Sequence, residues 1–283
     1  MFARVLERTR RVGLGPVLTY ALGRFPQVRG SYGTAMGLLQ RLGAVQGLSA
    51  HHDQSCFHGI SAPAIVADLE LQAGAFGLTL PPEILNALVA FCASARRKDW
   101  GSQRTVPLDA IREGRLPDGT PVFVADVVGA DLNTAALQVT RDPVLLAAVT
   151  GYLGYAPVGA HTRILHSPVV DAPYEARRNV QTVDYHFDVH GYNFVYANFY
   201  LSDVELNAGA HEMVLGSHAD KPAKWLFGSA RRTDQEILDY YGPERIKTIT
   251  GPAGTGFVQD SSCYHRVLAP VSQERLMLHI RYY

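Results

Sequence analysis

One short segment decides which fold the chain adopts: residues 184–190, Asp-Tyr-His-Phe-Asp-Val-His. If this segment is a β-strand, alternate side chains face the same side, so His186 and Asp188 point together. An imidazole and a carboxylate on one face supply two ligands for a divalent metal ion. Because chance often produces an alternating His-x-Asp pair, the pattern needs a third ligand from another strand.

His265 is the best third ligand in the sequence. It follows a predicted strand over 254–260, Gly-Thr-Gly-Phe-Val-Gln-Asp, which ends in a polar turn. A last strand is predicted over 275–283, with its leucines and isoleucine facing the core. The opposite face of that strand carries Arg275, Met277, His279 and Arg281. A guanidinium group there can bind a carboxylate through two charge-assisted hydrogen bonds, as an anionic cofactor beside the metal would require.

The rest of the chain divides into a helical half and a β-rich half. Helices are predicted from Pro81-Pro82-Glu83, with Arg96 to Lys98 at the C-terminal end, and from Asp142-Pro143 to Gly151. From about residue 155, short runs rich in Val, Ile, Tyr and Phe alternate with turn residues and predict a sandwich or barrel. These strands include residues 194–201, 246–250, 255–259 and 275–283.

Composition excludes several classes of protein. The 283 residues are 47% hydrophobic and 18% charged, which argues against disorder and coiled coil. The formal net charge is zero, so the chain lacks the basic excess of a general nucleic-acid binder. Three scattered cysteines form no CxxC pair and favour a reducing cytoplasm. We find no apolar run long enough to span a bilayer and no convincing signal peptide.

Residues 1–50 form a basic N-terminal extension that is predicted to be helical. They contain seven arginines and one acid, Glu7. The simplest interpretation is a solvated helical arm that packs on the main domain, residues 51–283. The alternative is contact with an anionic partner or a membrane surface, because apolar side chains are interleaved with the arginines.

The segment between the two metal elements resembles a known family. Tyr200-Leu201-Ser202-Asp203, Asn207-Ala208-Gly209-Ala210 and Leu215-Gly216-Ser217-His218 follow in the order and spacing of its L-x-D, N-G and P-G-S-H signature. With the HxD…H…R pattern, residues 181–283 resemble the phytanoyl-CoA dioxygenase family of iron(II)/2-oxoglutarate oxygenases. The resemblance implies an α+β fold with a double-stranded β-helix core, a cupin-like jelly roll, and N-terminal helices packed against one sheet.

The resemblance also implies a function. The chain would hydroxylate an unactivated C–H bond of a small or carrier-bound metabolite, using Fe(II), 2-oxoglutarate and O2 and releasing succinate and CO2. The implied metal ligands are His186, Asp188 and His265. Arg275 would bind the distal carboxylate of 2-oxoglutarate. The neutral amides of Gln181 and Asn198, and the second arginine Arg281, are further candidates for cofactor contact.

The sequence departs from the family pattern beside the ligands and leaves alternatives open. Tyr185 stands where the family usually has tryptophan, Leu215 replaces a proline, and Ala208 separates Asn207 from Gly209. These changes put the substrate in doubt more than the metal site, although the basic arm suits an anionic or lipid-linked one. The same iron centre could perform desaturation, epimerisation or cyclisation. A non-catalytic binding module that keeps the fold is the third hypothesis.

Overall fold

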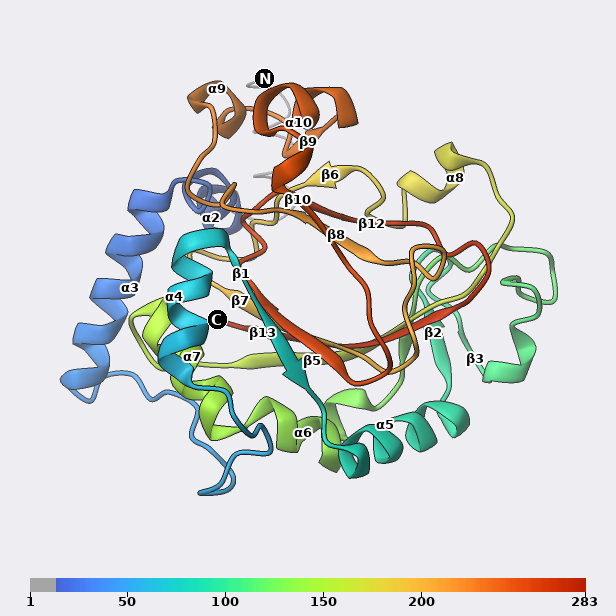
Figure 1. The fold of residues 1–283 in the computed structure, drawn as a ribbon, viewed down its shortest axis with the longest axis horizontal. Coiled ribbons are helices and arrows are strands. Elements are labelled where there is room, and N and C mark those ends of the chain that lie inside the picture. Colours follow the sequence, from blue (N-terminus) through green and yellow to red (C-terminus); the bar gives the residue numbers. More distant parts are fainter. Residues whose placement is uncertain (1–13) are drawn as a thin grey trace.

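The computed structural model describes residues 14–283, where helices and antiparallel sheets are mixed (Figure 1). The α-helices are α2 (Leu14–Leu22), α3 (Pro26–Arg41), α4 (Ala62–Gln72), α5 (Pro82–Ser94), α6 (Thr134–Thr140), α7 (Pro143–Leu153), α8 (Tyr174–Arg178), α9 (Ala223–Leu226) and α10 (Asp234–Tyr241). The strands are β1 (Gly74–Thr79), β2 (Arg97–Asp99), β3 (Thr105–Val106), β4 (Ala125–Val127), β5 (Ala160–Ser167), β6 (Tyr185–His186), β7 (Val195–Tyr200), β8 (His211–Val214), β9 (Arg231–Arg232), β10 (Ile246–Ile249), β11 (Thr255–Gln259), β12 (His265–Val267) and β13 (Arg275–Tyr282).

The strands form two antiparallel sheets. The larger sheet has eight strands in the order β1-β11-β7-β13-β5-β4-β2-β3. The smaller sheet has five in the order β10-β8-β12-β6-β9. Strands from distant parts of the sequence are therefore neighbours, and β13 near the C-terminus pairs with both β5 and β7.

Helices from the first half of the chain cover the outer face of the eight-stranded sheet (Figure 1). One hydrophobic cluster joins Leu69 of α4 and Val149 of α7 to Phe199 of β7 and to Leu278 and Ile280 of β13. All five side chains are fully buried. Burying such side chains stabilises the folded state by about 1.5–3 kcal/mol each, so this cluster holds the helices on the sheet.

The inner faces of the two sheets meet around a second cluster. Leu165, Phe257 and Met277 of the larger sheet pack with Met213 of β8 and Ile249 of β10. Beyond this contact, a cavity of about 410 Å³ lies between the sheets. Its lining comes from β5, β7 and β13 on one side and from β6, β8 and β12 on the other. One face of the larger sheet is thus covered by the helices, and the other face lines the cavity.

Four predicted strands are confirmed, and two helix boundaries are corrected. Residues 255–259 are β11, and the other three predicted segments contain β7, β10 and β13. Asp142 caps α7 by accepting hydrogen bonds from the backbone N–H groups of Val144 and Leu145. That helix runs past Gly151 to Leu153, where Gly154 ends it with a positive φ of 81°. Residues 96–98 were wrongly assigned to the end of the preceding helix, because α5 ends at Ser94 and Arg97 opens β2.

The division into a helical half and a β-rich half is also too simple. Strands β1 to β4 precede residue 155 and belong to the larger sheet. In β1, two buried residues are followed by Phe76 and Gly77, where the register with β11 shifts. That irregularity breaks the strict alternation by which a strand is recognised in sequence.

The described part of the N-terminal extension, residues 14–50, contains helices α2 and α3. Two of its arginines are buried against the β-rich half. Arg24 donates to the backbone carbonyls of Leu226 and Gly228, and Arg29 forms a 2.9 Å ion pair with Asp260. These arginines therefore attach the extension to the rest of the chain. Four other arginines, Arg4, Arg8, Arg10 and Arg11, lie outside the described residues.

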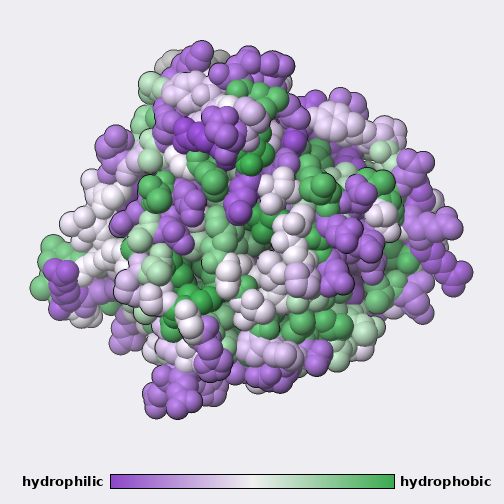
Figure 2. All heavy atoms as spheres, viewed as in Figure 1, coloured by the Kyte–Doolittle hydropathy of each residue, from purple (hydrophilic) through white to green (hydrophobic). Residues whose placement is uncertain are grey.

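Hydrophilic side chains gather over α10 and along the edge near β3 in the face that Figure 2 shows, and more hydrophobic groups lie between them. Across residues 14–283, no helix has the length and apolar character needed to cross a membrane.

Candidate metal centre

The structure brings His186, Asp188 and His265 together in one cluster. One ligand atom from each residue lies within 4.8 Å of the others. The Nε2 atoms of His186 and His265 are each 3.7 Å from a different oxygen of the Asp188 carboxylate. In the part of the chain that is described, this is the one group of its kind. The side chains line the cavity between the sheets.

Strand pairing explains why residues 79 positions apart meet. His186 in β6 is the direct antiparallel partner of His265 in β12, and their ring centroids are 4.3 Å apart. Asp188 does not share a strand with His186 as the sequence predicted, because β6 ends at His186. Its backbone N–H instead donates to the carbonyl of Ser261 at 2.8 Å, which fixes the loop after β6 against the segment before β12.

Backbone carbonyls orient both imidazoles. The Nδ1 atom of His186 lies 3.0 Å from the carbonyl of Asp184, and that of His265 lies 2.9 Å from the carbonyl of Cys263. A carbonyl oxygen only accepts, so each Nδ1 must carry the proton and donate it. Each Nε2 then presents a lone pair toward Asp188, which is the tautomer that binds a metal ion.

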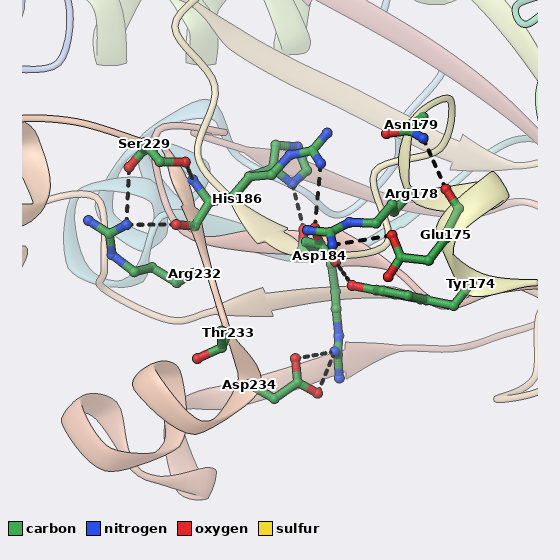
Figure 3. A network of polar contacts seen from close by, with 12 residues as sticks. Tyr174, Glu175, Arg178, Asn179, Asp184, His186, Ser229, Arg232, Thr233 and Asp234 are labelled. Atoms are coloured by element: carbon green, nitrogen blue, oxygen red, sulfur yellow. Dashed lines mark hydrogen bonds and ion pairs between the residues drawn. The ribbon is translucent and has the colours of Figure 1, made fainter. Parts of the chain in front are cut away.

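A network of charged residues holds Asp184 in place (Figure 3). Its carboxylate accepts hydrogen bonds from the Tyr174 hydroxyl and, at 3.0 Å, from Arg178 of α8. Arg231 of β9 approaches the same carboxylate at 3.4 Å. Because the carbonyl of Asp184 orients His186, this network positions a candidate metal ligand from outside the cavity.

The protonation states of the cluster also suit a metal ion. Burial lowers the pKa of His265 to about 4, so its imidazole is neutral at neutral pH. Burial alone would raise the pKa of Asp188. A hydrogen bond from His190 and the nearby imidazoles of His265 and His186 lower this pKa by more than burial raises it, so the carboxyl is ionised. Neutral imidazoles and an ionised carboxylate are the forms that coordinate a cation.

Arg275 lies at the closed end of the cavity and is 1% exposed. One terminal nitrogen donates to the carbonyl of Gly209 at 2.6 Å, and the other is 3.5 Å from the Ser167 hydroxyl. Gly209 has a φ of 78°, a conformation that side chains with a Cβ rarely adopt. The Nε atom of Arg275 is buried and has no hydrogen-bond partner within residues 14–283. An anionic ligand would satisfy this guanidinium.

The other predicted contact residues, Gln181, Asn198 and Arg281, also line the cavity. Gln181 accepts from Arg177 through its amide oxygen, whereas its buried Nε2 has no partner in the described chain. The Asn198 amide oxygen is 2.7 Å from Nδ1 of His279, so that part of Asn198 is occupied within the protein. Arg281 comes from the same face of β13 as Arg275.

His211 on β8 also lines the cavity, and no motif predicted it. Its ring stacks on that of His265 with 5.4 Å between centroids. Both ring nitrogens are buried without a hydrogen-bond partner among residues 14–283. Burial lowers its pKa well below the usual value, so the ring is neutral. Only the pairing of β8 with β12 places His211 beside the predicted ligands, and that pairing was not readable from sequence.

Comparison with known proteins defines the class of fold. No model of a protein family matches the sequence, and no curated protein matches it. Solved structures do match. One is the non-haem alpha-ketoglutarate-dependent carbocyclase SnoK from nogalamycin biosynthesis, with a TM-score of 0.51 and 17% identity. That match covers 82% of this chain and 86% of SnoK.

EvdO2 from Micromonospora carbonacea var. aurantiaca, solved in complex with 2-oxoglutarate, is a second match. Its TM-score is 0.52 at 12% identity, over 81% of this chain and 93% of EvdO2. At such low identities the likeness establishes a shared fold and no more. The mixed α and antiparallel β architecture predicted from the sequence is confirmed at this level.

Proposed function

We propose that this chain is an Fe(II)/2-oxoglutarate-dependent oxygenase that hydroxylates an unactivated C–H bond of a small or carrier-bound metabolite. One observation carries the proposal: two imidazole Nε2 atoms and one carboxylate converge in a cavity between two sheets. Two histidines and one carboxylate on one side of a metal ion leave coordination positions open for a cofactor and oxygen. This is the ligand set of non-haem iron(II) oxygenases.

The polar groups of the cavity suit 2-oxoglutarate. Several of them are buried without partners in the described chain, among them Nε of Arg275, Nε2 of Gln181 and the ring nitrogens of His211. The Arg275 and Gln181 atoms are donors, and each ring nitrogen of His211 is a donor in one of its two neutral tautomers. A dicarboxylate supplies acceptor oxygens for them, and Arg275 is the charged group that would bind its distal carboxylate. The residues therefore fit the cofactor.

The protein residues have distinct roles in this proposal. When bound, iron and 2-oxoglutarate supply the oxidising chemistry. His186, Asp188 and His265 hold the metal, and the backbone carbonyls of Asp184 and Cys263 fix the two imidazoles in the binding tautomer. Arg275 and His211 orient the cofactor at the closed end of the cavity. The apolar side chains of Leu165 and Met277 limit the access of water.

We further propose that the two sheets form the double-stranded β-helix of the phytanoyl-CoA dioxygenase family, with residues 51–283 as its domain and 1–50 as an extension. The motifs in 181–283 and the shared fold support this assignment. Three free thiols suit a reducing cytoplasm. Membrane-surface contact would depend on the arginines before residue 14.

Turnover tests the proposal. The purified protein is loaded with Fe(II) and 2-oxoglutarate in the absence of oxygen. Air is then admitted, and the succinate formed is measured by mass spectrometry. We expect succinate to form only when all three components are present, even in slow turnover without substrate. If the folded protein binds Fe(II) and 2-oxoglutarate but forms no succinate with any candidate substrate, the binding-module hypothesis replaces ours. The mass of the oxidised product separates hydroxylation from desaturation, epimerisation and cyclisation.

A further inference from the structure

The cavity has an arginine at each end of strand β13. Arg275 and Arg281 both line it, because alternate residues of a strand share a face. Arg275 is almost fully buried, whereas Arg281 is half-buried and its cross-strand neighbour His161 is exposed. Six residues of extended chain separate the two arginines by roughly 20 Å. One end of the cavity is therefore closed, and the other opens to solvent.

The candidate metal ligands lie near the stretch of β13 between these two ends of the cavity. His279 lies between the two arginines on the same face of β13 and is paired with Asn198 and Arg163 on the flanking strands. Burial lowers the pKa of His279 to about 3, and the nearby Asp188 carboxylate opposes that shift. A cofactor that extends from the metal to Arg275 would leave the other direction, toward Arg281, for the substrate.

Charge is not balanced in the lining of the cavity. The lining carries three arginines and one acid, Asp188. Arg163 is neutralised by Asp126, which it contacts through two nitrogens at 2.5 and 2.7 Å. Arg275 would be neutralised by 2-oxoglutarate. Arg281 has no ion pair with a carboxylate anywhere in residues 14–283, and its buried Nε atom has no hydrogen-bond partner there.

We infer that the open end of the cavity is an oxyanion subsite, in which Arg281 binds a carboxylate or phosphate group of the substrate. This inference rests on the proposed function and assigns Arg281 to the substrate instead of the cofactor. Tyr196 stands opposite Arg281 in the register of β7, and His161 stands opposite it on β5. The aromatic ring of Tyr196, which lines the cavity opposite Arg281, supplies wall for a carbon skeleton. The substrate class is thus a carbon skeleton with one anionic end.

Calorimetric titration tests the inference. The protein is loaded anaerobically with Fe(II) and saturating 2-oxoglutarate, which keeps Arg275 occupied. The probes are hexanoate, octanoate, hexyl phosphate and octyl phosphate, with hexanamide and octanamide as neutral matches. Arg281→Gln removes the charge, Arg281→Lys restores a point charge without the fork, and Arg41→Gln is the control, since Arg41 is exposed on α3.

We expect the anions to bind more tightly than the amides, and Arg281→Gln to weaken the anions by about tenfold or more. Arg281→Lys should be intermediate and Arg41→Gln unchanged. The probe class, carboxylate or phosphate, whose affinity depends more strongly on Arg281 identifies the anion. The inference is overturned if amides bind as well as anions, if no anion binds, or if Arg281→Gln weakens 2-oxoglutarate instead. Failure to bind Fe(II) or 2-oxoglutarate would contradict the proposed function separately, and titration of the metal-free protein would still report on Arg281.

Discussion

Single side chains of the proposed metal site are already oriented in the structure without a metal. The carbonyls of Asp184 and Cys263 accept the Nδ1 protons of His186 and His265, so both Nε2 lone pairs are directed at Asp188. Little rearrangement is needed on binding, and preorganisation of this kind raises affinity because fewer side chains have to be ordered.

Loss of a candidate ligand should remove the metal. We expect His265→Ala to abolish stoichiometric Fe(II) binding in anaerobic calorimetry, because two remaining ligands cannot hold the ion against water. His58→Ala is the matched control, since His58 is exposed and lies outside the cavity. Circular dichroism shows whether each variant folds. Unchanged Fe(II) affinity in a folded His265→Ala protein would mean that the cluster is not the metal site.

Arg275 should determine affinity for 2-oxoglutarate and not for iron. We expect Arg275→Gln to raise the Kd of 2-oxoglutarate by about ten- to hundredfold, the value of charge-assisted hydrogen bonds in a buried site. Fe(II) binding should stay at the wild-type level. The measurement is calorimetric titration of the Fe(II)-loaded protein. An unchanged Kd here, together with a raised Kd in Arg281→Gln, would move the anchor to the other end of β13.

At the scale of elements, helix α3 is attached directly behind the metal cluster. Arg29 pairs with Asp260 and donates to the Ser262 hydroxyl, and Tyr152 of α7 donates to the same carboxylate at 2.6 Å. Ser261 lies between Asp260 and Ser262, and its backbone carbonyl accepts the hydrogen bond from the Asp188 N–H. The N-terminal extension therefore supports the loop that positions a candidate ligand.

Removal of one partner of this buried pair should be costly. We expect Arg29→Met to lower the free energy of unfolding by about 3–5 kcal/mol, because Asp260 is left buried without its cation. The double variant Arg29→Met/Asp260→Asn should lose less than the sum of the single variants. Urea unfolding measures both. Additive losses would show that the two side chains do not interact energetically.

The same ion pair should make the free energy of unfolding depend on pH in the acidic range. Burial raises the pKa of Asp260, but Arg29 and His218 lower it more, so the folded pKa lies below the unfolded value. Such a carboxylate stabilises the fold above its unfolded pKa, about 4, and this contribution is lost as the pH falls below that value. We expect the difference in unfolding free energy between wild type and Asp260→Asn to shrink from pH 6 toward pH 3.

The sequence predicted strand periodicity better than strand pairing. Alternation in 275–283 separated Leu276, Leu278 and Ile280 from the cavity-facing residues, as the structure confirms. By contrast, β6 was expected to extend to Asp188 and stops at His186, because the next residues follow the loop to Ser261. His211 was missed for a related reason: long-range pairing of β8 and β12 places it, and local patterns do not encode that pairing.

On the scale of the whole molecule, packing should protect the thiols. Burial raises the pKa of Cys92 to about 11 and that of Cys56 and Cys263 to about 12. Because the thiolate is the reactive form, we expect the native protein to react slowly with a disulfide reagent at pH 8 and all three thiols to react after denaturation. Absorbance of the released thiol measures both rates. Fast reaction of the native protein would indicate a looser core.

The mixed α and antiparallel β architecture was predictable from the last hundred residues, because ligands from two distant segments can meet only if those segments lie side by side. Strands β1 to β4 were not, since they are short or irregular and gain their stability from the sheet they join. The substrate is the least accessible part, because residues from separate strands such as His161, Tyr196 and Arg281 define the open end together.

Anaerobic titration followed by visible absorption tests the central claim most directly. Fe(II) and then 2-oxoglutarate are added to the wild-type protein, with His186→Ala titrated in parallel. If the three side chains hold one iron with room for a keto acid, a weak charge-transfer band should appear only when both components are present, saturate at one iron per chain and be absent in His186→Ala. A folded wild-type protein that shows no band, or a variant that shows the same band, would contradict the account.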